Sequence, residues 1–433
     1  MTAPSASLTS EHPNSYYAAS AHRAPARPAF SGEEETDVCV VGAGLCGLSA
    51  ALHLAEHGYR VKVLEAQRVG WGASGRNGGQ FIFGFSCDMP VMRSLVGRED
   101  SLKLWKMSLE SLELVRELVG THQIECDLVQ GQMHAAIKPR QSEDLHAWKE
   151  DLESEYGYSG LELWEGDELR ERIQTERYRT GLFDPNSGHL HPLNFTLGLA
   201  EAAERAGAVI HESTAVHEVE AGDPARIRTD RGTLRAKFVV LAGNAYLGEV
   251  SRPLRRRLMP VGTYIGATEP LGEARARELI RDNMAVADIN FVLDYYRLSA
   301  DHRMLFGGRV SYSTMEPRNL AEAMRERMLL VFPQLQEARM EYAWGGFVGI
   351  TMNRAPNLGW LAPNVLYAQG FSGHGVAMAP LAGKLMAEGV AGSAERFDVF
   401  SRIPHSDFPG GKLLRMPSLV LAMAYFRLRD LLP

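Results

Sequence analysis

The feature that most constrains this chain is a glycine loop at residues 42–47, with the sequence Gly-Ala-Gly-Leu-Cys-Gly. An apolar run at residues 37–41 precedes it, as expected of a strand buried on both faces of a parallel sheet. Residues 48–57 carry apolar side chains at helical spacing, and a glycine follows them. A second apolar run then ends on Glu65. This order predicts a βαβ unit that binds a dinucleotide.

Each glycine of this loop has a separate physical purpose. Gly42 permits the tight turn, Gly44 lets the backbone approach a pyrophosphate, and Gly47 lets the helix pack closely on the strand. The free N–H groups of the helix N-terminus attract the phosphates. Glu65 is placed to accept hydrogen bonds from ribose hydroxyls and disfavours a 2′-phosphate, so NADP is not expected. NAD and FAD both remain open at this point, beside a βαβ unit that binds no nucleotide.

Two further glycine-rich segments favour FAD over NAD. Residues 70–80 replace the βα repeat with which a nicotinamide enzyme would continue, and such a loop can lie flat against a large ring system. A flexible surface loop is the alternative. Residues 370–376 follow a predicted strand and open a helix, whose dipole can stabilise a reduced flavin. His374 in this segment is a candidate catalytic residue, and a simple hydrogen-bonding role near the cofactor is the alternative.

The remaining pattern alternates between helices and strands. Helices are predicted at residues 101–120, 141–156, 192–206 and 320–331. Strands at residues 258–268, 289–298 and 303–308 predict a separate antiparallel sheet, with a hairpin turn at residues 300–302.

Bulk properties exclude several classes of function. The net charge of −7 over 433 residues, with one short basic run at residues 252–257, does not indicate nucleic acid binding. The four cysteines form no CxxC pair, so no metal site is expected. No window approaches the ~20 apolar residues of a transmembrane span, and no secretory signal is evident. We therefore expect a cytoplasmic protein that acts on a small molecule.

Together the glycine loops, residues 239–244 and residues 370–376 resemble the D-amino acid oxidase (DAO) family of flavoproteins, in the expected order from residue 36 to about residue 400. Within that family, residues 15–20, 75–80 and 344–356 are most similar to members that oxidise γ-glutamylputrescine. The resemblance implies a mixed α/β fold, with a Rossmann-like FAD-binding domain of the glutathione-reductase or DAO type and an antiparallel-sheet substrate domain.

The expected division of the chain is discontinuous. It comprises an N-terminal arm at 1–35, an FAD-binding domain at 36–90, 185–250 and 355–400, a substrate domain at 91–184 and 251–354, and a C-terminal tail at 401–433. The arm is either flexible or anchored by Tyr16, Tyr17 and Phe30. The apolar stretch 413–432 is expected to be a helix that covers the protein's own core or a partner, or else one that lies on a membrane surface.

The expected FAD contacts follow these segments. They are Gly42, Ala43, Gly44, Leu45, Cys46, Gly47, Glu65, Ala66, Gly72, Ala73, Ser74, Arg76, Asn77, Gly78, Gly79, Gln80, Val216, Ala242, Gly243, Gly370, Phe371, Ser372, Gly373, His374, Gly375 and Val376. Because no cysteine follows Cys126, a C-terminal cysteine linkage to flavin is excluded and FAD is expected to be non-covalent.

The expected class of substrate follows from the motif that begins at Trp344, which differs from the motif of amino-acid oxidases in this family. Amino-acid oxidases of this family tend to carry an Arg shortly after Trp-x-Gly, which binds the substrate α-carboxylate. Phe347 stands there and offers no charge-assisted hydrogen bond. Asn353 replaces a frequent Asp. An amine on an aliphatic chain is therefore favoured over an amino acid. A relocated arginine stays open, with three candidates: Arg76, Arg297 and Arg309.

Residues 289–297 are expected to contribute the substrate pocket. By alternation Asp294 and Tyr296 share one face, and Tyr295 points the other way. Aromatic walls suit an aliphatic diamine, and a carboxylate could hold a distal ammonium. Plain sheet packing is the alternative for each of them and for Tyr264. The candidate catalytic and substrate residues are Asp294, Tyr296, Trp344, Phe347 and His374.

The resemblance implies an FAD-dependent amine oxidase. It would convert a primary amine such as γ-glutamylputrescine to an aldehyde, ammonia and hydrogen peroxide, by hydride transfer to flavin N5 with molecular oxygen as acceptor. One alternative is a D-amino acid or N-methyl amino acid oxidase or dehydrogenase. A second is a non-catalytic flavin-binding subunit.

Overall fold

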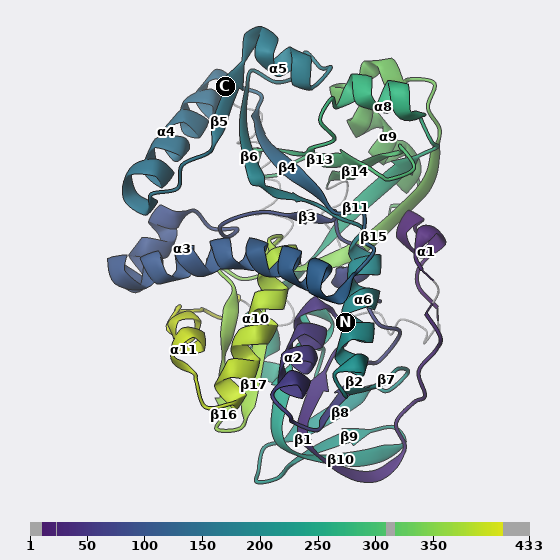
Figure 1. Cartoon of the computed structure of the whole chain (residues 1–433), viewed down its shortest axis with the longest axis vertical. Helices are drawn as coiled ribbons and strands as arrows, with labels where there is room; N and C mark the ends of the chain where they lie inside the picture. Colours follow the sequence, from purple (N-terminus) through teal and green to yellow (C-terminus); the bar gives the residue numbers. More distant parts are fainter. Residues whose placement is uncertain (1–10, 23, 309–316, 410–433) are drawn as a thin grey trace.

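The computed structural model describes residues 11–22, 24–308 and 317–409. The molecule is built around two β-sheets, and the long helix α3 crosses between them (Figure 1). The described helices of four residues or more are α1 (Tyr16–Ser20), α2 (Leu45–Glu56), α3 (Met89–His122), α4 (Pro139–Tyr156), α5 (Gly166–Arg172), α6 (Pro192–Arg205), α7 (Arg252–Arg256), α8 (Glu273–Leu279), α9 (Leu320–Val331), α10 (Gly375–Val390) and α11 (Glu395–Ser401).

The first sheet has the strand order β16-β17-β10-β1-β2-β7, and β8 and β9 extend it beside β10. Its strands are β1 (Gly32–Val41), β2 (Val61–Leu64), β7 (Val209–His211), β8 (Val216–Glu220), β9 (Ala225–Thr229), β10 (Gly232–Leu241), β16 (Asn357–Ala362) and β17 (Val365–Gln369). The central strands β17, β10, β1, β2 and β7 run parallel. Val38 and Val40 face the cluster formed with α2, α6 and α10, whereas Cys39 and Val41 face β9.

The second sheet has the order β15-β11-β14-β13-β12-β4-β6-β3, with β5 beside β6. Its strands are β3 (Gln80–Phe81), β4 (Val129–Ala136), β5 (Glu162–Glu165), β6 (Thr180–His189), β11 (Met259–Thr268), β12 (Ala285–Asp288), β13 (Tyr295–Leu298), β14 (Met304–Gly308) and β15 (Met340–Ile350). All described pairs are antiparallel except β12 with β4. Helices α8 and α9 cover one face over a second apolar core. The mixed α/β fold with two different sheets is thus confirmed.

Two elements differ from the sequence prediction. The strand predicted at 289–298 begins only at Tyr295, because Asp288 accepts hydrogen bonds from the N–H groups of Asn290 and Asp294, which folds the intervening residues into a loop. The helix predicted at 101–120 is longer, since α3 starts at Met89 and continues through a kink at Gly97, whose φ is 81°.

The described part of the N-terminal arm is anchored along the molecule. Ser15 caps α1 by accepting a hydrogen bond from the N–H of Ala18 over 3.1 Å. Tyr16, Tyr17 and Phe30 are all buried. Figure 1 shows α1 beside β15 and the arm running down the edge of the molecule to β1. The arm therefore connects the two sheets from outside.

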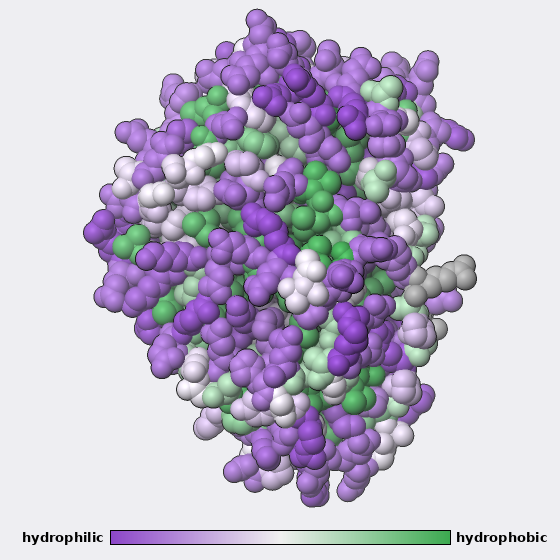
Figure 2. Space-filling view, viewed as in Figure 1, coloured by the Kyte–Doolittle hydropathy of each residue, from purple (hydrophilic) through white to green (hydrophobic). Residues whose placement is uncertain are grey.

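The outer face drawn in Figure 2 is mainly hydrophilic, with small scattered apolar patches. Within residues 11–22, 24–308 and 317–409, no helix is both long enough and apolar enough to cross a membrane. The helix expected at 413–432 lies outside the described residues. The division into discontinuous domains remains a proposal.

Candidate active site

The carboxyl ends of three neighbouring parallel strands bring three predicted glycines together. Gly42 follows β1, Gly243 follows β10, and Gly370 follows β17. The N–H of Ala242 donates to the carbonyl of Val41 over 2.9 Å, and the N–H of Gly370 donates to Oδ1 of Asn244 over 3.1 Å. Ligands of open parallel sheets bind at this edge.

The glycine loop has no space for side chains. A Cβ on Gly47 would lie 2.0 Å from the carbonyl oxygen of Gly42, and a Cβ on Gly44 would lie 2.7 Å from Oγ of Ser74. Gly42 has a φ of 105°, a conformation that other residues rarely adopt. Gly44 is the N-cap of α2 and offers no side chain. The loop therefore presents bare backbone to whatever approaches the helix N-terminus.

Glu65 lies against this loop. Its carboxylate accepts hydrogen bonds from the N–H of Ala43 over 2.7 Å and from the N–H of Gln67 over 2.9 Å. Burial raises the pKa of Glu65, and the two backbone donors oppose that change. The N–H of Thr214 donates to the Glu65 carbonyl over 2.7 Å, which brings the segment leading into Val216 alongside.

The segment 70–80 folds onto the start of α2. Oγ of Ser74 accepts a hydrogen bond from the N–H of Leu45 over 3.0 Å. Asn77 holds the turn closed, because its amide donates to the carbonyls of Ala73 and Ser74 and accepts from the N–H of Gly79. These bonds fix the loop at the edge of the parallel sheet.

An aromatic group connects this loop to the second sheet. The Arg76 guanidinium lies 4.0 Å from the centre of the Trp71 ring and donates to the Trp71 carbonyl. Tyr246 lies between Trp71 and Phe347, with ring centres 5.8 and 6.0 Å away. Its hydroxyl accepts a hydrogen bond from the N–H of Phe347 over 3.1 Å. Phe347 is thus half-buried on β15, near the predicted loop.

Tyr295 and Tyr296 point to opposite faces of β13, as alternation predicts. A Cβ on Gly78 would lie 2.6 Å from the Tyr295 ring, so this tyrosine faces the predicted cofactor loop. The Tyr295 hydroxyl lies 3.4 Å from Oγ1 of Thr263. Tyr296 is fully buried on the other face, where it stacks on Phe306.

The expected placement of Asp294 and Tyr296 in the substrate pocket therefore needs correction. The Tyr296 hydroxyl donates to the Tyr178 hydroxyl over 3.1 Å inside the second core. Asp294 is buried and accepts a hydrogen bond from Nε of Arg327 on α9 over 2.7 Å. Tyr264 is also buried in that core. The reason is that α9 covers this face of the sheet, which leaves Tyr295 on the face toward Gly78.

Trp344 lies between the arm and the predicted loop. Its indole N–H donates to the carbonyl of Arg76 over 3.1 Å, and its ring meets Tyr17 edge-on at 5.1 Å. It is buried at 2% exposure. These contacts hold the segment 70–80 in place.

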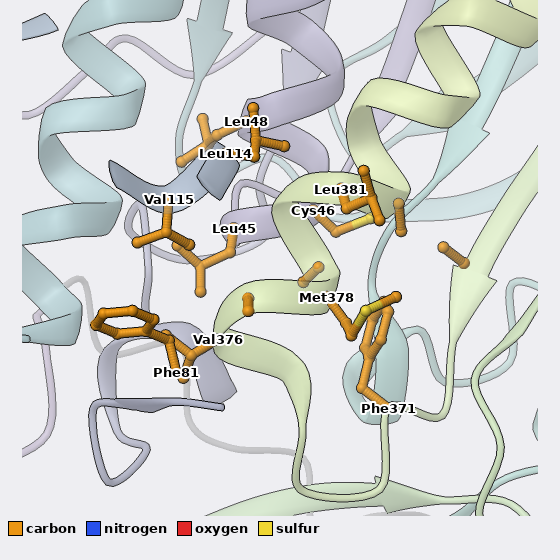
Figure 3. Packing of buried hydrophobic residues seen from close by; sticks show 14 of the residues in the cluster. Leu45, Cys46, Leu48, Phe81, Leu114, Val115, Phe371, Val376, Met378 and Leu381 are labelled. Atoms are coloured by element: carbon orange, nitrogen blue, oxygen red, sulfur yellow. The ribbon is translucent and has the colours of Figure 1, made fainter. Parts of the chain in front are cut away.

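The segment 370–376 closes the same edge of the sheet. The N–H of Ser372 donates to the carbonyl of Gly349 over 3.1 Å, and His374 is the N-cap of α10. Burial is the main cause that lowers the pKa of His374 to about 3, with His134 and Arg354 contributing. The imidazole is therefore neutral at ordinary pH. Figure 3 shows Phe371 and Val376 in the apolar cluster shared with Leu45 and Cys46 of α2.

Of the three candidates for a relocated arginine, two are used within the protein. Arg297 donates to the carbonyls of Gly78, Leu190 and Leu298 and to the Tyr17 hydroxyl. Arg76 holds Trp71 and also donates to the carbonyl of Gly345. Arg309 lies outside the described residues.

Comparison with known proteins identifies the fold and the cofactor. The family model described as FAD dependent oxidoreductase (DAO) matches residues 37–389. This chain belongs to the DAO family of FAD-dependent oxidoreductases. It is 44% identical to gamma-glutamylputrescine oxidoreductase of Escherichia coli, over 97% of this chain and 99% of that protein. It is 40% identical to the probable oxidoreductase OrdL of Haemophilus influenzae, over 97% of this chain and 98% of that protein. The chain is thus an enzyme, an oxidoreductase that uses FAD.

Solved structures support the fold. Glycine oxidase from Bacillus cereus superposes with a TM-score of 0.71 at 21% identity, over 86% of this chain and 99% of that chain. L-proline dehydrogenase from P. horikoshii superposes with a TM-score of 0.66 at 20% identity, over 82% and 93%. The fold class and the DAO resemblance drawn from the sequence are confirmed.

The residues at the sheet edge fit FAD. Bare backbone at Gly42 and Gly44 suits the pyrophosphate, and Glu65 suits the ribose. The indole N–H of Trp71 is a buried donor with no hydrogen-bond partner among the described residues, so a polar group of the cofactor can satisfy it. The contacts of individual residues with FAD remain proposals.

Sequence reasoning missed several residues at this edge. No motif marks Tyr246 or Thr263. The position of Thr263 follows from the pairing of β11 with β15, and that of Tyr246 from its hydrogen bond with the N–H of Phe347. No sequence pattern marks Arg354 as a functional residue. Its position after β15, with a φ of 62°, is evident only in the fold.

Proposed function

We propose that this chain oxidises the terminal primary amine of the putrescine part of γ-glutamylputrescine. The products are an aldehyde and ammonia, and molecular oxygen is reduced to hydrogen peroxide. The observation that carries the proposal is the 44% identity, over nearly the whole of both chains, to a protein named gamma-glutamylputrescine oxidoreductase. The solved glycine oxidases support the fold alone, because their identity is near 21%.

The position of Phe347 favours an amine over an amino acid as the substrate. It lies on β15 opposite Gly262 and beside Tyr246, where its apolar ring cannot pair with a carboxylate. Of the three candidate arginines, Arg76 and Arg297 are already bonded to backbone carbonyls, and Arg309 lies outside the described residues. An amine whose reacting carbon carries only aliphatic neighbours fits this surface.

The protein's part in the reaction is to bind and orient the amine. When bound, FAD supplies the acceptor for a hydride from the carbon next to nitrogen. Tyr295 and Thr263 face Gly78 from the second sheet, and we propose that they direct the amine toward the ring. The oxidised substrate is an imine, which takes up water and releases ammonia and the aldehyde. Oxygen accepts the two electrons and two protons.

His374 is proposed to hydrogen-bond near the cofactor rather than to carry charge. Burial and its neighbours lower its pKa to about 3, so it adds no positive charge at neutral pH. The amine must be deprotonated to release a hydride, so kcat/KM should rise with pH as the substrate ammonium loses its proton.

Anaerobic mixing with a substrate panel tests the proposal. Gamma-glutamylputrescine should bleach the flavin absorbance, and D-alanine and sarcosine should bleach it far more slowly. Stoichiometric peroxide on readmission of air identifies oxygen as the acceptor, whereas turnover with a dye alone indicates a dehydrogenase. Bleaching by D-alanine or sarcosine in preference would show an amino-acid oxidase, and no bleaching by any amine would contradict the proposal.

We also propose that FAD is bound without a covalent link. The four cysteines are buried, and burial raises the thiol pKa of Cys46, Cys87 and Cys126 to about 12, so the thiols are not nucleophilic thiolates. Acid precipitation should release all the yellow flavin into the supernatant. Flavin fluorescence that stays with the denatured chain would contradict this. The cytoplasmic location expected from the sequence remains a prediction.

A further inference from the structure

Arg354 is a half-buried cation that is not held by a salt bridge among the described residues, although the charge of Asp88 acts on it. It follows β15 in a turn where its N–H donates to the carbonyl of Thr351 over 3.1 Å. Its Nε donates to Oγ of Ser86 over 3.1 Å, and its guanidinium lies 5.0 Å from the centre of the Phe291 ring. Within the described part of the chain, it takes part in no ion pair with an Asp or Glu. Both Nη groups are left to bind something else.

This guanidinium lies beside the predicted cofactor segment 370–376. Ser86, which accepts from Arg354, itself donates to the carbonyl of Ser372 over 2.8 Å. The charge of Arg354 also acts on His374, the N-cap of α10. A two-step hydrogen-bonded path thus connects the guanidinium to the loop that opens α10.

The other side of the guanidinium faces the substrate sheet. Phe291 belongs to the loop between β12 and β13, and β13 carries Tyr295 against Gly78. Arg354 therefore lies between the segment 370–376, which it reaches through Ser86, and the loop that leads to Tyr295.

Other arginines of the second sheet have several partners within the protein, and Arg297 donates to three backbone carbonyls and the Tyr17 hydroxyl. Arg327 pairs with Asp294, and Arg303 pairs with Asp301 and Glu341. Burial lowers the pKa of Arg354, and the negative charge of Asp88 opposes this change without forming an ion pair. A buried charge is unfavourable unless it is paired, so an anion that binds there gains strong charge-assisted hydrogen bonds.

We propose that Arg354 binds the carboxylate at the far end of the amine substrate and so selects amines that carry a remote carboxylate. The inference rests on the proposed function. In γ-glutamylputrescine this carboxylate is roughly 12 Å from the reacting nitrogen when the chain is extended, at ~1.2 Å per bond. The same enzyme can therefore lack an arginine beside the reacting carbon, where Phe347 stands, and still recognise an acidic substrate.

The test compares two substrates in two variants. Gamma-glutamylputrescine and N-acetylputrescine share the reacting amine and the amide, and only the first has a carboxylate. Arg354→Met should raise KM for γ-glutamylputrescine by about 10- to 100-fold, the loss expected for hydrogen bonds to a charged group. The kcat for this substrate and the kcat/KM for N-acetylputrescine should change by less than about twofold. Arg354→Lys should restore part of the affinity.

Arg339→Met is the matched control, because Arg339 is paired with Glu269 on the exterior of the second sheet. It should leave both substrates unaffected. An equal loss with both substrates in Arg354→Met would overturn the proposal and assign Arg354 a structural role.

A ligand without the terminal amine of putrescine separates this proposal from the proposed function. Gamma-glutamyl-n-butylamide keeps the glutamyl carboxylate and α-amine but lacks the terminal amine on which the proposed reaction acts. Its binding is measured by perturbation of the flavin spectrum in the holoenzyme. Binding to the wild type and loss in Arg354→Met support the carboxylate site even if no amine in the panel bleaches the flavin. Equal binding to both proteins, or binding to neither, overturns the site.

Discussion

Tyr17 accepts a hydrogen bond from Nη2 of Arg297 over 3.1 Å, and Nε of the same guanidinium donates to the carbonyl of Gly78 over 2.8 Å. A single arginine thus connects the N-terminal arm to the loop predicted to contact the flavin. The Tyr17 ring also contacts Trp344, which holds the carbonyl of Arg76 in that loop. The arm is therefore part of the support of the candidate active site.

Removing the Tyr17 hydroxyl should loosen this support. Tyr17→Phe is expected to lower the free energy of unfolding of the holoenzyme by about 1.5 kcal/mol in urea titrations, because a hydrogen bond to a charged group is lost. FAD should also dissociate faster, as measured by fluorescence. Tyr16→Phe is the control: it loses a hydrogen bond to Asp301, so stability should fall without faster FAD release. Equal FAD release in both variants would contradict the connection.

The tight contact at Gly47 predicts that alanine is not tolerated there. A Cβ would lie 2.0 Å from the carbonyl oxygen of Gly42, so Gly47→Ala should displace the loop or α2. The variant should purify without bound FAD or fail to fold. Gly120→Ala is the control, because nothing lies within 4 Å of its Cβ and alanine should stabilise α3 by about 0.5–1 kcal/mol. Normal flavin content in Gly47→Ala would refute the assigned contact.

The neighbours Tyr295 and Tyr296 should behave oppositely. Tyr295→Phe removes a hydroxyl that faces the cofactor side, so kcat/KM for the amine should fall severalfold while Tm stays nearly constant. Tyr296→Phe removes the hydrogen bond to Tyr178 inside the second core, so Tm should fall with kcat/KM unchanged. Stability is lost by about 1 kcal/mol for a neutral hydrogen bond. The reverse pattern would show that the two faces have been misassigned.

Stability should fall as pH rises because of Asp288. Burial and the neighbouring Asp294 raise the pKa of Asp288 from 3.8 to about 7. The folded protein then binds a proton that the unfolded chain has released, so the contribution is complete below about pH 4 and is lost as pH rises through about 7.

Thermal unfolding of the wild type and of Asp288→Asn, recorded across this interval, measures the effect. The variant should show a flatter decrease of Tm with pH, because its amide does not titrate. Parallel pH profiles in the two proteins would show that Asp288 is not responsible.

The FAD-binding glycine loop could be predicted from the sequence because the residues that it needs are close together along the chain. Gly42, Gly44 and Gly47 lie within one strand–helix turn, and this glycine spacing is typical of turns that bind a dinucleotide. The residues that face the substrate could not be predicted in this way. Alternation gives the relation between Tyr295 and Tyr296 but not which face α9 covers, and that is decided by tertiary packing.

The N-terminal arm and Arg354 are further features whose contacts could not be predicted from the sequence. Tyr17 and Phe30 were recognised as possible anchors, yet their partners lie far along the chain and only the folded structure reveals them. Arg354 has no pattern around it that signals a buried cation. Its neighbours, Ser86 and Phe291, come from two other segments of the chain.

The connection between Tyr17 and Arg297 also sets an order of events during synthesis. The two residues are 280 positions apart, and ribosomes add roughly 5–20 residues per second, so Tyr17 leaves the ribosome on the order of 15–55 s before its partner. The arm cannot dock until β13 has emerged. The glycine loop and α2 are translated early, but Arg297, which holds Gly78 and Tyr17, is translated late. We therefore expect the nascent chain to retain FAD firmly only after the second sheet has formed.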